Sequence, residues 1–245
     1  MVNRTLEEHT KFYEGYTNKA IRYHSDTTRK DFQAQLWFEL DRNKISLSML
    51  GNLCKDKDVI DLGSAHWVEK ALLKQIGAKS IVKVDIAPDD GEALKLDACD
   101  TQLPEKSFDV VICRELIEHV LDADKLMNEI RRLLKDNGYL LIATPNVFNL
   151  PPDGEAHIGG YTPRGFIQIL ERHNFTILDK RGNIPAIFQA LIPMVVEGYQ
   201  WILDEFVEIS QKMEETPSSY YFGTNMFILG QKGCNVKDTS CPTLA

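Results

Sequence analysis

The clearest structural signal in the chain is Asp58-Val59-Ile60-Asp61-Leu62-Gly63, a short apolar run that stops at a glycine. Apolar residues then recur at helical spacing between residues 68 and 76, and Gly77 suits the left-handed cap that often ends a helix. These patterns predict one strand, one turn and one helix in succession. In a sheet built from such units, the first strand-to-helix turn is where the backbone approaches a ligand closely.

Short runs of apolar, mostly β-branched residues recur at residues 81–85, 108–113 and 139–143, with helical or loop segments between them. Strands that alternate with helices indicate an α/β fold, a parallel, doubly wound sheet of the Rossmann-like type. Two later runs predict further strands at residues 175–178 and 221–230.

Capping residues mark the expected helix boundaries. One helix is expected to begin near residues 122–124, to bury Leu134 and to end at Gly138. Another is expected to begin at the N-cap Thr162, with Pro163 at its first helical position.

The chain is expected to form a single domain, because 245 residues with 43% hydrophobic side chains suit one large core. That domain would cover residues 1–233, and the remaining residues would form a disordered tail. The expected parts are an N-terminal helical lid at residues 1–52, a cofactor-binding core at 53–182, a helical insertion at 183–220, a last strand at 221–233 and the tail at 234–245.

The composition bears on partners and compartment. A net charge of -8 and an isoelectric point near 5.3 provide no broad basic surface, so no nucleic-acid partner is expected. Five cysteines without metal-site spacing suit reduced thiols and predict no disulfide. Residues 1–10 lack the apolar core of a signal peptide, and no stretch reaches the ~18 apolar residues of a membrane span. A soluble, cytoplasmic protein without a transmembrane segment is therefore expected.

Acidic residues end the first two predicted strands. Asp61 stands two residues before Gly63, and Asp85 follows that glycine by 22 residues. An acid in the second position can accept hydrogen bonds from both ribose hydroxyls of a nucleoside. The turn at residues 63–67 has one glycine and a bulky indole, unlike the G-x-G-x-x-G of a pyrophosphate site. The acid before the glycine suits instead a cofactor with an ammonium group and no phosphate, such as S-adenosylmethionine.

Six segments follow one another along the chain: Asp61-Leu62-Gly63, Val84-Asp85, Leu96-Asp97-Ala98, Leu103-Pro104 with Ser107 to Val111, Glu115 to Val120, and Gly138-Tyr139-Leu140 through Thr144-Pro145-Asn146. Their succession resembles the motifs of class I S-adenosylmethionine-dependent methyltransferases, and the order is more specific than any one segment. The quinone-biosynthesis O-methyltransferases and related small-molecule enzymes are the most similar. The resemblance implies a seven-stranded sheet whose last strand is antiparallel.

The resemblance also implies roles for individual positions. The turn at Gly63 would hold the methionine part of the cofactor, Asp85 the ribose, and Asp97 with Ala98 the adenine. A loop aspartate such as Asp97 is equally compatible with simple solvation. The main chain of Arg114 would border the methionine amine. The positions assigned to cofactor binding are Arg42, Asp61, Gly63, Ser64, Ala65, Asp85, Ile86, Asp97, Ala98 and Arg114.

Two positions depart from the family pattern, and a third matches it approximately. Ala65 and Trp67 stand where the family usually has glycines, so Trp67 either packs against the sheet or reshapes the pocket. Arg42 resembles an arginine that faces the cofactor carboxylate in the quinone O-methyltransferases, with a slightly different spacing to the first strand.

Methyl transfer from a sulfonium is an in-line displacement, so an enzyme mainly aligns the reactants and removes a proton where the nucleophile carries one. His119 is the best candidate for that base, because its ordinary pKa of about 6.5 allows proton uptake near neutrality. A histidine that only caps its loop is the alternative. Glu115, Glu118 and His119 form E-x-x-E-H, which one helical turn would bring together as the predicted catalytic residues.

The E-x-x-E-H pattern, with His157 approaching from another loop, also matches the divalent-metal cluster of the small-RNA 2′-O-methyltransferases. Carboxylate and imidazole ligands suit Mg²⁺ or Mn²⁺, and a bound metal would lower the pKa of a hydroxyl. Because the pattern also occurs in family members that look metal-independent, a metal is left open but is not favoured.

Two segments outside the core are candidates for closing the site. Tyr13, Tyr16, Tyr23 and His24 are spaced so that they could fold over the cleft as a lid that excludes water, or simply pack between helices. The apolar insertion at residues 184–209 could wall an apolar substrate, form a homodimer interface, rest on a membrane surface or pack into the core.

The sequence thus predicts an enzyme that transfers a methyl group from S-adenosylmethionine to a hydroxyl or amine of a small, partly apolar molecule. Two alternatives stay open. One is a metal-assisted RNA 2′-O-methyltransferase, against which the acidic composition argues. The other is a cofactor-binding protein that has lost transfer, which the glycine-poor turn permits.

Overall fold

The structure is a computed structural model that describes residues 4–25, 27–28, 32–64, 75–88, 91–147, 156–183, 212 and 219–233. The named elements within these ranges follow in chain order. They are α1 (Leu6–Ser25), α2 (Phe32–Leu50), β1 (Asp58–Leu62), β2 (Ser80–Asp85), β3 (Leu94–Lys95), β4 (Phe108–Arg114), α4 (Ala123–Leu133), β5 (Leu134–Pro145), α5 (Pro163–Arg172), β6 (Phe175–Gly182), α9 (Ser219–Phe222) and β7 (Asn225–Lys232).

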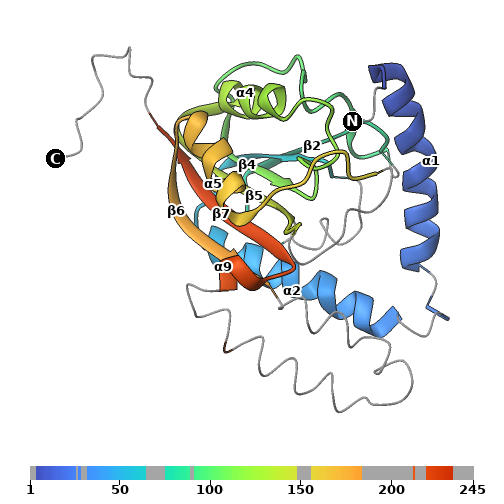
Figure 1. The fold of residues 1–245 in the computed structure, drawn as a ribbon. Coiled ribbons are helices and arrows are strands. Elements are labelled where there is room, and N and C mark those ends of the chain that lie inside the picture. The colour runs from blue at the N-terminus through green and yellow to red at the C-terminus, as the bar shows by residue number, and fades with distance from the viewer. Residues whose placement is uncertain are drawn as a thin grey trace.

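Seven strands form one sheet in the order β3-β2-β1-β4-β5-β7-β6. The five strands β3, β2, β1, β4 and β5 are parallel to one another, and β7 runs antiparallel to both β5 and β6. Figure 1 shows α1 standing at one end of the molecule, away from α5 and β6 at the other. The predicted Rossmann-like sheet of seven strands with an antiparallel last strand is therefore confirmed.

Alternation along the strands divides the buried side chains between the two faces of the sheet. On β4, Val111 and Cys113 belong to the cluster that includes residues of α4 and α5, whereas Val110 and Ile112 belong to the cluster that includes residues of α2. The central strands are thus buried on both faces. Strands of this kind read as continuous apolar runs, which is why the sequence pattern located them.

Both helices on the first face begin at the expected caps. Asp122 accepts a hydrogen bond from the backbone N–H of Lys125 at the start of α4. Thr162 accepts one from the backbone N–H of Gly165 at the start of α5, where Pro163 is the first helical residue. Each cap satisfies a backbone donor that has no partner inside its helix.

The helix α4 ends earlier than the sequence predicts. Leu134 already has an extended backbone, and it pairs with Phe108 at the start of β5. The predicted end, Gly138, lies inside β5, where an added Cβ would stand 3.0 Å from the carbonyl oxygens of Asp109 and Lys135. Leu134 is buried although it lies in the strand, so the apolar pattern of the helix continues into β5. The end of α4 therefore cannot be located from the sequence pattern.

The last strand begins later than predicted. Residues 221–222 belong to α9, and β7 starts at Asn225. Tyr220 explains the difference, since its fully buried side chain donates a hydrogen bond to the carbonyl oxygen of Pro163 in α5. An aromatic run that is typical of a strand is therefore used as a turn of helix packed against α5.

Two edge strands also differ from the predictions. The strand β3 has two residues, too few to show an alternating pattern, and it was not predicted. The strand β6 extends beyond the predicted end at residue 178 and reaches Gly182. Its second half contains Asp179, Lys180 and Arg181, so the hydrophobic pattern that marks a strand stops before the strand does.

Several predicted features lie outside the described residues. They are most of the helix at residues 68–76, the insertion at 184–209 with its dimer surface, and the tail at 234–245. Gly77, next to the first of these, has a φ of +63°, as its predicted capping role requires.

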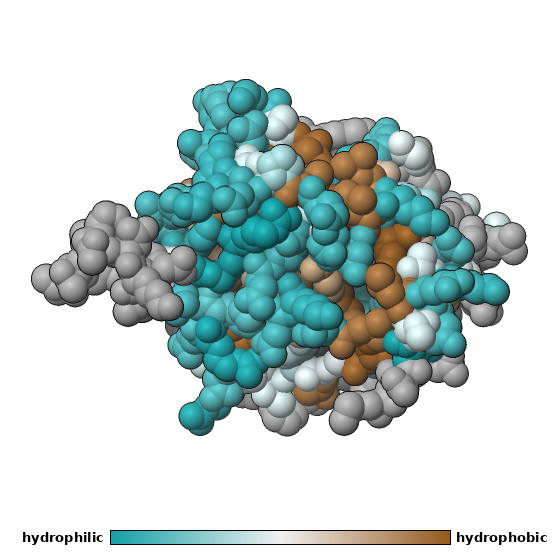
Figure 2. All heavy atoms as spheres, turned by 90° about the horizontal axis from the view of Figure 1, so that it is seen from above, coloured by the Kyte–Doolittle hydropathy of each residue, from teal (hydrophilic) through white to brown (hydrophobic). Residues whose placement is uncertain are grey.

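Hydrophilic and apolar residues share the face shown in Figure 2: hydrophilic residues cover its left half, and apolar atoms gather from the upper centre to the lower right. No helix in the described ranges is long and apolar enough to cross a membrane. Cys54, Cys99 and Cys113 are free thiols, and the other two cysteines lie outside the described part of the chain.

Candidate functional site

The candidate site lies at the carboxyl ends of the central parallel strands, where the strand order reverses between β1 and β4. Asp61 and Gly63 stand at the end of β1, Asp85 ends β2 and Arg114 ends β4. Parallel strands end at the same edge of a sheet, so residues from distant parts of the chain converge there.

The turn after β1 passes close to a neighbouring segment. Gly63 has a φ of +81°, and a Cβ there would stand 3.2 Å from the Cβ of Leu116, so both conformation and space require glycine. The next residue, Ser64, is fully buried, and its hydroxyl makes no hydrogen bond within the described part of the chain. A buried hydroxyl of this kind suits a ligand that offers a hydrogen-bonding group. Ala65, the following predicted contact, lies outside the described residues.

Backbone amides hold two carboxylates beside this turn. Oδ1 of Asp85 accepts a hydrogen bond from the N–H of Ala87 at 2.7 Å. Oδ1 of Asp97 accepts one from the N–H of Cys99 at 2.8 Å. These bonds fix the orientation of both side chains. The neighbouring predicted contacts are the half-buried Ile86 and the buried Ala98.

Arg114 directs its side chain toward α2. Its Nη1 donates to Oδ1 of Asn43 at 3.0 Å and to Oγ of Ser46 at 3.1 Å, and all three residues are buried. The guanidinium thus attaches α2 to the end of β4. The main chain of Arg114, the part predicted to border the cofactor amine, stays at the strand end.

Glu115 is held away from the other two predicted catalytic residues. Its Oε2 lies 3.1 Å from Nη1 of Arg42 and accepts a hydrogen bond from Nδ2 of Asn225 at 2.7 Å. Its φ of +51° is uncommon for a residue with a side chain. The expectation that E-x-x-E-H forms one helical turn is therefore wrong, because this backbone conformation separates Glu115 from Glu118 and His119. Arg42 accordingly faces a protein carboxylate.

Glu118 is the buried carboxyl group of the site, with 2% of its surface exposed. Its Oε2 accepts a hydrogen bond from the hydroxyl of Thr144 in β5 at 2.9 Å. Burial raises the pKa of Glu118 to about 7, while hydrogen bonds from its own backbone and from Thr144, together with the charge of Arg42, oppose the rise. Burial therefore favours the protonated form of this carboxyl at higher pH than in an exposed glutamate.

The imidazole of His119 is oriented through Nδ1. That atom lies 2.9 Å from the carbonyl oxygen of Ala156 and 2.9 Å from the hydroxyl of Tyr13 in α1. A carbonyl oxygen can only accept, so Nδ1 carries the hydrogen and Nε2 keeps the lone pair. Nε2 lies 3.9 Å from Oε1 of Glu118. It is the nitrogen whose lone pair can take up a proton or bind a cation.

Glu118, His119 and His157 form a compact group. One possible ligand atom from each lies within 4.8 Å of the others, and the two imidazole rings are 4.8 Å apart. Carboxylate and imidazole groups at this spacing are able to hold a divalent cation. Glu115, the expected fourth member, stands outside the group because it is bound to Arg42 and β7.

The helix α1 covers this group. The hydroxyl of Tyr13 also donates to the carbonyl oxygen of Ala156 at 2.8 Å, and Lys95 in β3 forms an ion pair of 2.7 Å with Glu14. His9 is buried with its ring 4.8 Å from that of Tyr13. The N-terminal segment thus contacts both the sheet edge and the turn that bears His119. The other three predicted lid residues, Tyr16, Tyr23 and His24, have side chains outside the described part.

A known protein family matches the part of the chain that contains the candidate site. Residues 36–180, more than half of the chain, match the family described as Methyltransferase domain. The chain belongs to this family. The family-level prediction made from the motifs is thereby confirmed.

Curated relatives of this methyltransferase domain match part of it. A ubiquinone biosynthesis O-methyltransferase of Bradyrhizobium diazoefficiens is 28% identical over 144 residues, which cover 52% of this chain and 55% of that protein. A probable S-adenosylmethionine-dependent methyltransferase of Mycobacterium tuberculosis is 25% identical over 138 residues, which cover 52% of this chain and 49% of that protein. The chain spans about half the length of these curated relatives.

Solved structures resemble the methyltransferase domain over most of its length. The 1,6-didemethyltoxoflavin-N1-methyltransferase of Burkholderia thailandensis, solved with 1,6-didemethyltoxoflavin and S-adenosylhomocysteine bound, has a TM-score of 0.58 at 14% identity, covering 95% of this chain and 94% of that chain. A SAM-dependent methyltransferase of Aquifex aeolicus has a TM-score of 0.56 at 14% identity, covering 88% and 98%. At such identities the likeness supports the fold alone.

Three groups that orient side chains of the candidate site were not predicted as part of it. The side chain of Thr144, the carbonyl of Ala156 and the side chain of Asn225 hold, respectively, Glu118, His119 and Glu115. Thr144 had a sequence signal, since it belongs to one of the family motifs. A backbone carbonyl leaves no such signal, because any residue type could supply it.

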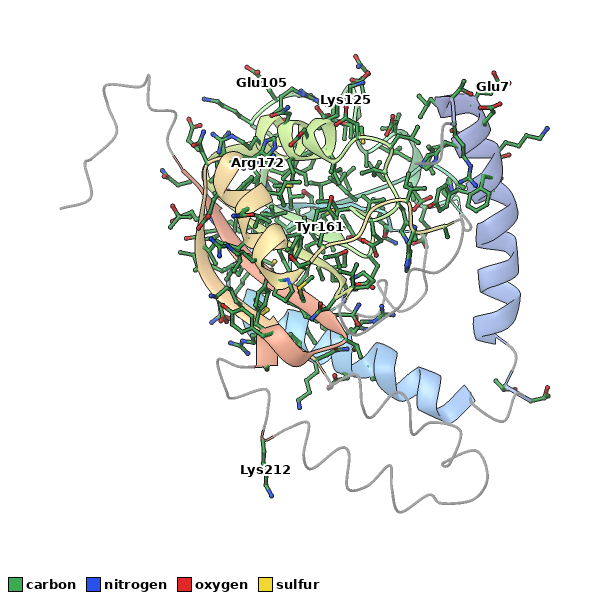
Figure 3. The ribbon with its side chains drawn as sticks, viewed as in Figure 1. Glu7, Glu105, Lys125, Tyr161, Arg172 and Lys212 are labelled. Carbon is green, nitrogen blue, oxygen red and sulfur yellow. The ribbon has the colours of Figure 1, made fainter. Side chains whose placement is uncertain are left out.

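Tyr161 is a further neighbour of the methyltransferase site. The half-buried Tyr161 lies near the middle of the view in Figure 3, whereas Glu105 and Lys125 lie near its upper margin. Burial raises the pKa of Tyr161 to about 12, and the charge of Glu118 adds to the rise. Its phenol therefore stays neutral at physiological pH and is no candidate for the base.

The raised pKa of Glu118 predicts how the stability of the ligand-free methyltransferase domain depends on pH. The pKa rises from 4.5 to about 7 on folding, so between these values the folded state keeps a proton that the unfolded state releases. The free energy of unfolding should therefore fall, relative to that of Glu118→Gln, as pH rises from 4.5 to 7, by up to roughly 3 kcal/mol. Denaturant unfolding of both proteins across this range measures the difference. If the free energies of unfolding of the two proteins changed with pH in the same way, the prediction would be contradicted.

Proposed function

We propose that this protein transfers a methyl group from S-adenosylmethionine to a hydroxyl or amine of a small, partly apolar molecule and releases S-adenosylhomocysteine. The observation that carries the proposal is the placement of Asp61 and Asp85 at adjacent strand ends, on the same edge of the sheet as His119. Bound cofactor would supply an electrophilic methyl carbon on a sulfonium.

The residues around β1 and β2 fit the parts of that cofactor. Asp61 is a buried carboxylate suited to an ammonium group, and the buried hydroxyl of Ser64 lies in the adjoining turn. The oriented carboxylate of Asp85 would accept the ribose hydroxyls. Asp97 would accept from the adenine amino group, with the small, buried Ala98 beside it.

His119 would receive the proton of the methyl acceptor. Its Nδ1 is already protonated toward Ala156, so Nε2 would be the accepting atom. The side chain is 16% exposed, which leaves the ring accessible to a small molecule. Glu118, with Oε1 3.9 Å from Nε2, would stabilise the imidazolium that forms.

A second candidate uses the group formed by Glu118, His119 and His157 to hold a divalent cation. Such a cation would lower the pKa of an acceptor hydroxyl, as in the metal-assisted alternative raised by the sequence. The metal-free form is favoured because Glu115 is engaged by Arg42 and does not join the group. Unchanged turnover in the presence of EDTA would exclude the metal.

The direct test is to incubate the protein with methyl-labelled S-adenosylmethionine and candidate small metabolites and to measure masses. We expect one metabolite to gain one methyl, and calorimetry to show that both the cofactor and S-adenosylhomocysteine bind. Binding without any transfer would favour the non-catalytic alternative. Absence of binding would contradict the cofactor assignment itself.

A further inference from the structure

We propose that Tyr13 of α1 is a positioning residue for His119, so that the orientation of the imidazole depends on the docking of the N-terminal helix. This inference rests on the role of His119 in the proposed function. Tyr13 is 8% exposed although it lies on a helix outside the sheet. Its hydroxyl, Nδ1 of His119 and the carbonyl oxygen of Ala156 form a triangle with sides of 2.8, 2.9 and 2.9 Å.

The hydrogens in this triangle have a single consistent arrangement. The carbonyl of Ala156 accepts twice, from the hydroxyl of Tyr13 and from Nδ1–H of His119. The hydroxyl oxygen of Tyr13 then has a lone pair available for the same Nδ1–H. If Nδ1 were instead unprotonated, its lone pair would face that of the carbonyl at 2.9 Å. Tyr13 therefore reinforces the tautomer in which Nε2 is the accepting atom.

The tyrosine also restricts the ring itself. The rings of Tyr13 and His119 meet edge to face with centroids 5.5 Å apart, and the ring of His157 lies 4.8 Å from the same imidazole. Aromatic pairs at these distances are in favourable contact. Rotation of the imidazole would break these contacts together with the hydrogen bonds to Nδ1.

A second residue on the same face of α1 reaches the same turn. His9 precedes Tyr13 by one helical turn, and its buried side chain lies close enough to His119 for the two groups to interact electrostatically. Glu14 is joined to Lys95 of β3 at 2.7 Å. The helix is thus attached to the sheet edge and to the His119 turn at once, and displacement of α1 would remove the hydroxyl from Nδ1.

The test is Tyr13→Phe, which keeps the ring and removes the hydroxyl. With ¹⁵N-labelled histidine, NMR should show the wild-type His119 protonated at Nδ1, with the signal assigned through His119→Gln. In Tyr13→Phe the exchange of this hydrogen with water should be about 2- to 13-fold faster, the equivalent of ~0.5–1.5 kcal/mol for one hydrogen bond. The matched control is Tyr139→Phe, which lies in the middle of β5, pairs with Val110 near the start of β4, and should leave the exchange rate unchanged.

Two outcomes would overturn the proposal: an Nε2-protonated imidazole in the wild type, or an exchange rate in Tyr13→Phe equal to that of the wild type. Calorimetry with S-adenosylhomocysteine separates this result from the proposed function. Wild-type protein that fails to bind S-adenosylhomocysteine would overturn the methyl-transfer proposal. The exchange rate is measured without any ligand and tests only the role of Tyr13. We expect equal affinity in the wild type and in Tyr13→Phe, because Tyr13 is not among the residues proposed to contact the cofactor.

Discussion

His119→Gln is expected to lower kcat by about 10²- to 10⁴-fold, the range typical for loss of a general base. Glutamine has a similar reach, but it cannot take up a proton at neutral pH. The rate is measured with the acceptor identified by methyl labelling. The dissociation constant for S-adenosylhomocysteine should change less than about threefold, because an interaction made only with the reacting proton does not contribute to cofactor binding.

His173→Gln is the matched control. Nε2 of His173 lies 2.8 Å from the exposed Asp124, and His173 is not part of the group of Glu118, His119 and His157, so its loss should leave kcat unchanged. The residual rate of His119→Gln should rise with pH, because at higher pH the acceptor loses its proton to solvent and no longer needs His119 to remove it. Full activity of His119→Gln at neutral pH would contradict the assignment of the base.

The central sheet could be predicted from the sequence because its strands are buried on both faces. Val110 to Cys113 alternate between two clusters, yet all are apolar, so the run is visible without knowledge of its neighbours. The caps Asp122 and Thr162 could also be predicted, since each acts within three residues of itself. Local chemistry of this kind needs no tertiary information.

The errors arose where a tertiary contact determined the local conformation. Leu134 continues the apolar period of α4, but pairing with Phe108 makes it the first residue of β5. The predicted strand at residues 221–230 begins instead in α9, where the neighbouring Tyr220 donates its hydroxyl hydrogen to Pro163 and is buried in the core. Neither partner is near in sequence, so pattern and propensity could not identify them.

In the site, too, some features could be predicted from the sequence and others depend on tertiary contacts. The strand ends that present Asp61 and Asp85 follow from the order of the sheet, and the motif spacing was sufficient to predict them. The arrangement of E-x-x-E-H was not predictable, because it depends on the positive φ of Glu115 and on its ion pair with Arg42. Helical spacing was therefore the wrong guide to which of its side chains meet.

The largest effect on cofactor binding is expected from Asp85→Ala. Two hydrogen bonds from ribose hydroxyls to a charged carboxylate would be lost, at ~1.5–3 kcal/mol each, so the dissociation constant for S-adenosylhomocysteine should rise by about 10²- to 10⁴-fold. Asp85→Asn should fall between this variant and the wild type, because its amide oxygen can still accept from Ala87. Isothermal calorimetry measures both.

Asp136→Asn controls for the loss of one negative charge, since Asp136 is exposed, lies near the start of β5 and pairs with Lys106. Its affinity for S-adenosylhomocysteine should equal that of the wild type. Thermal unfolding must show that Asp85→Ala is folded, because the side chain also holds the backbone of Ala87. A folded Asp85→Ala protein with wild-type affinity would mean that the ribose binds elsewhere. The cofactor could then not lie across the ends of β1 and β2, where methyl transfer to a molecule beside His119 requires it.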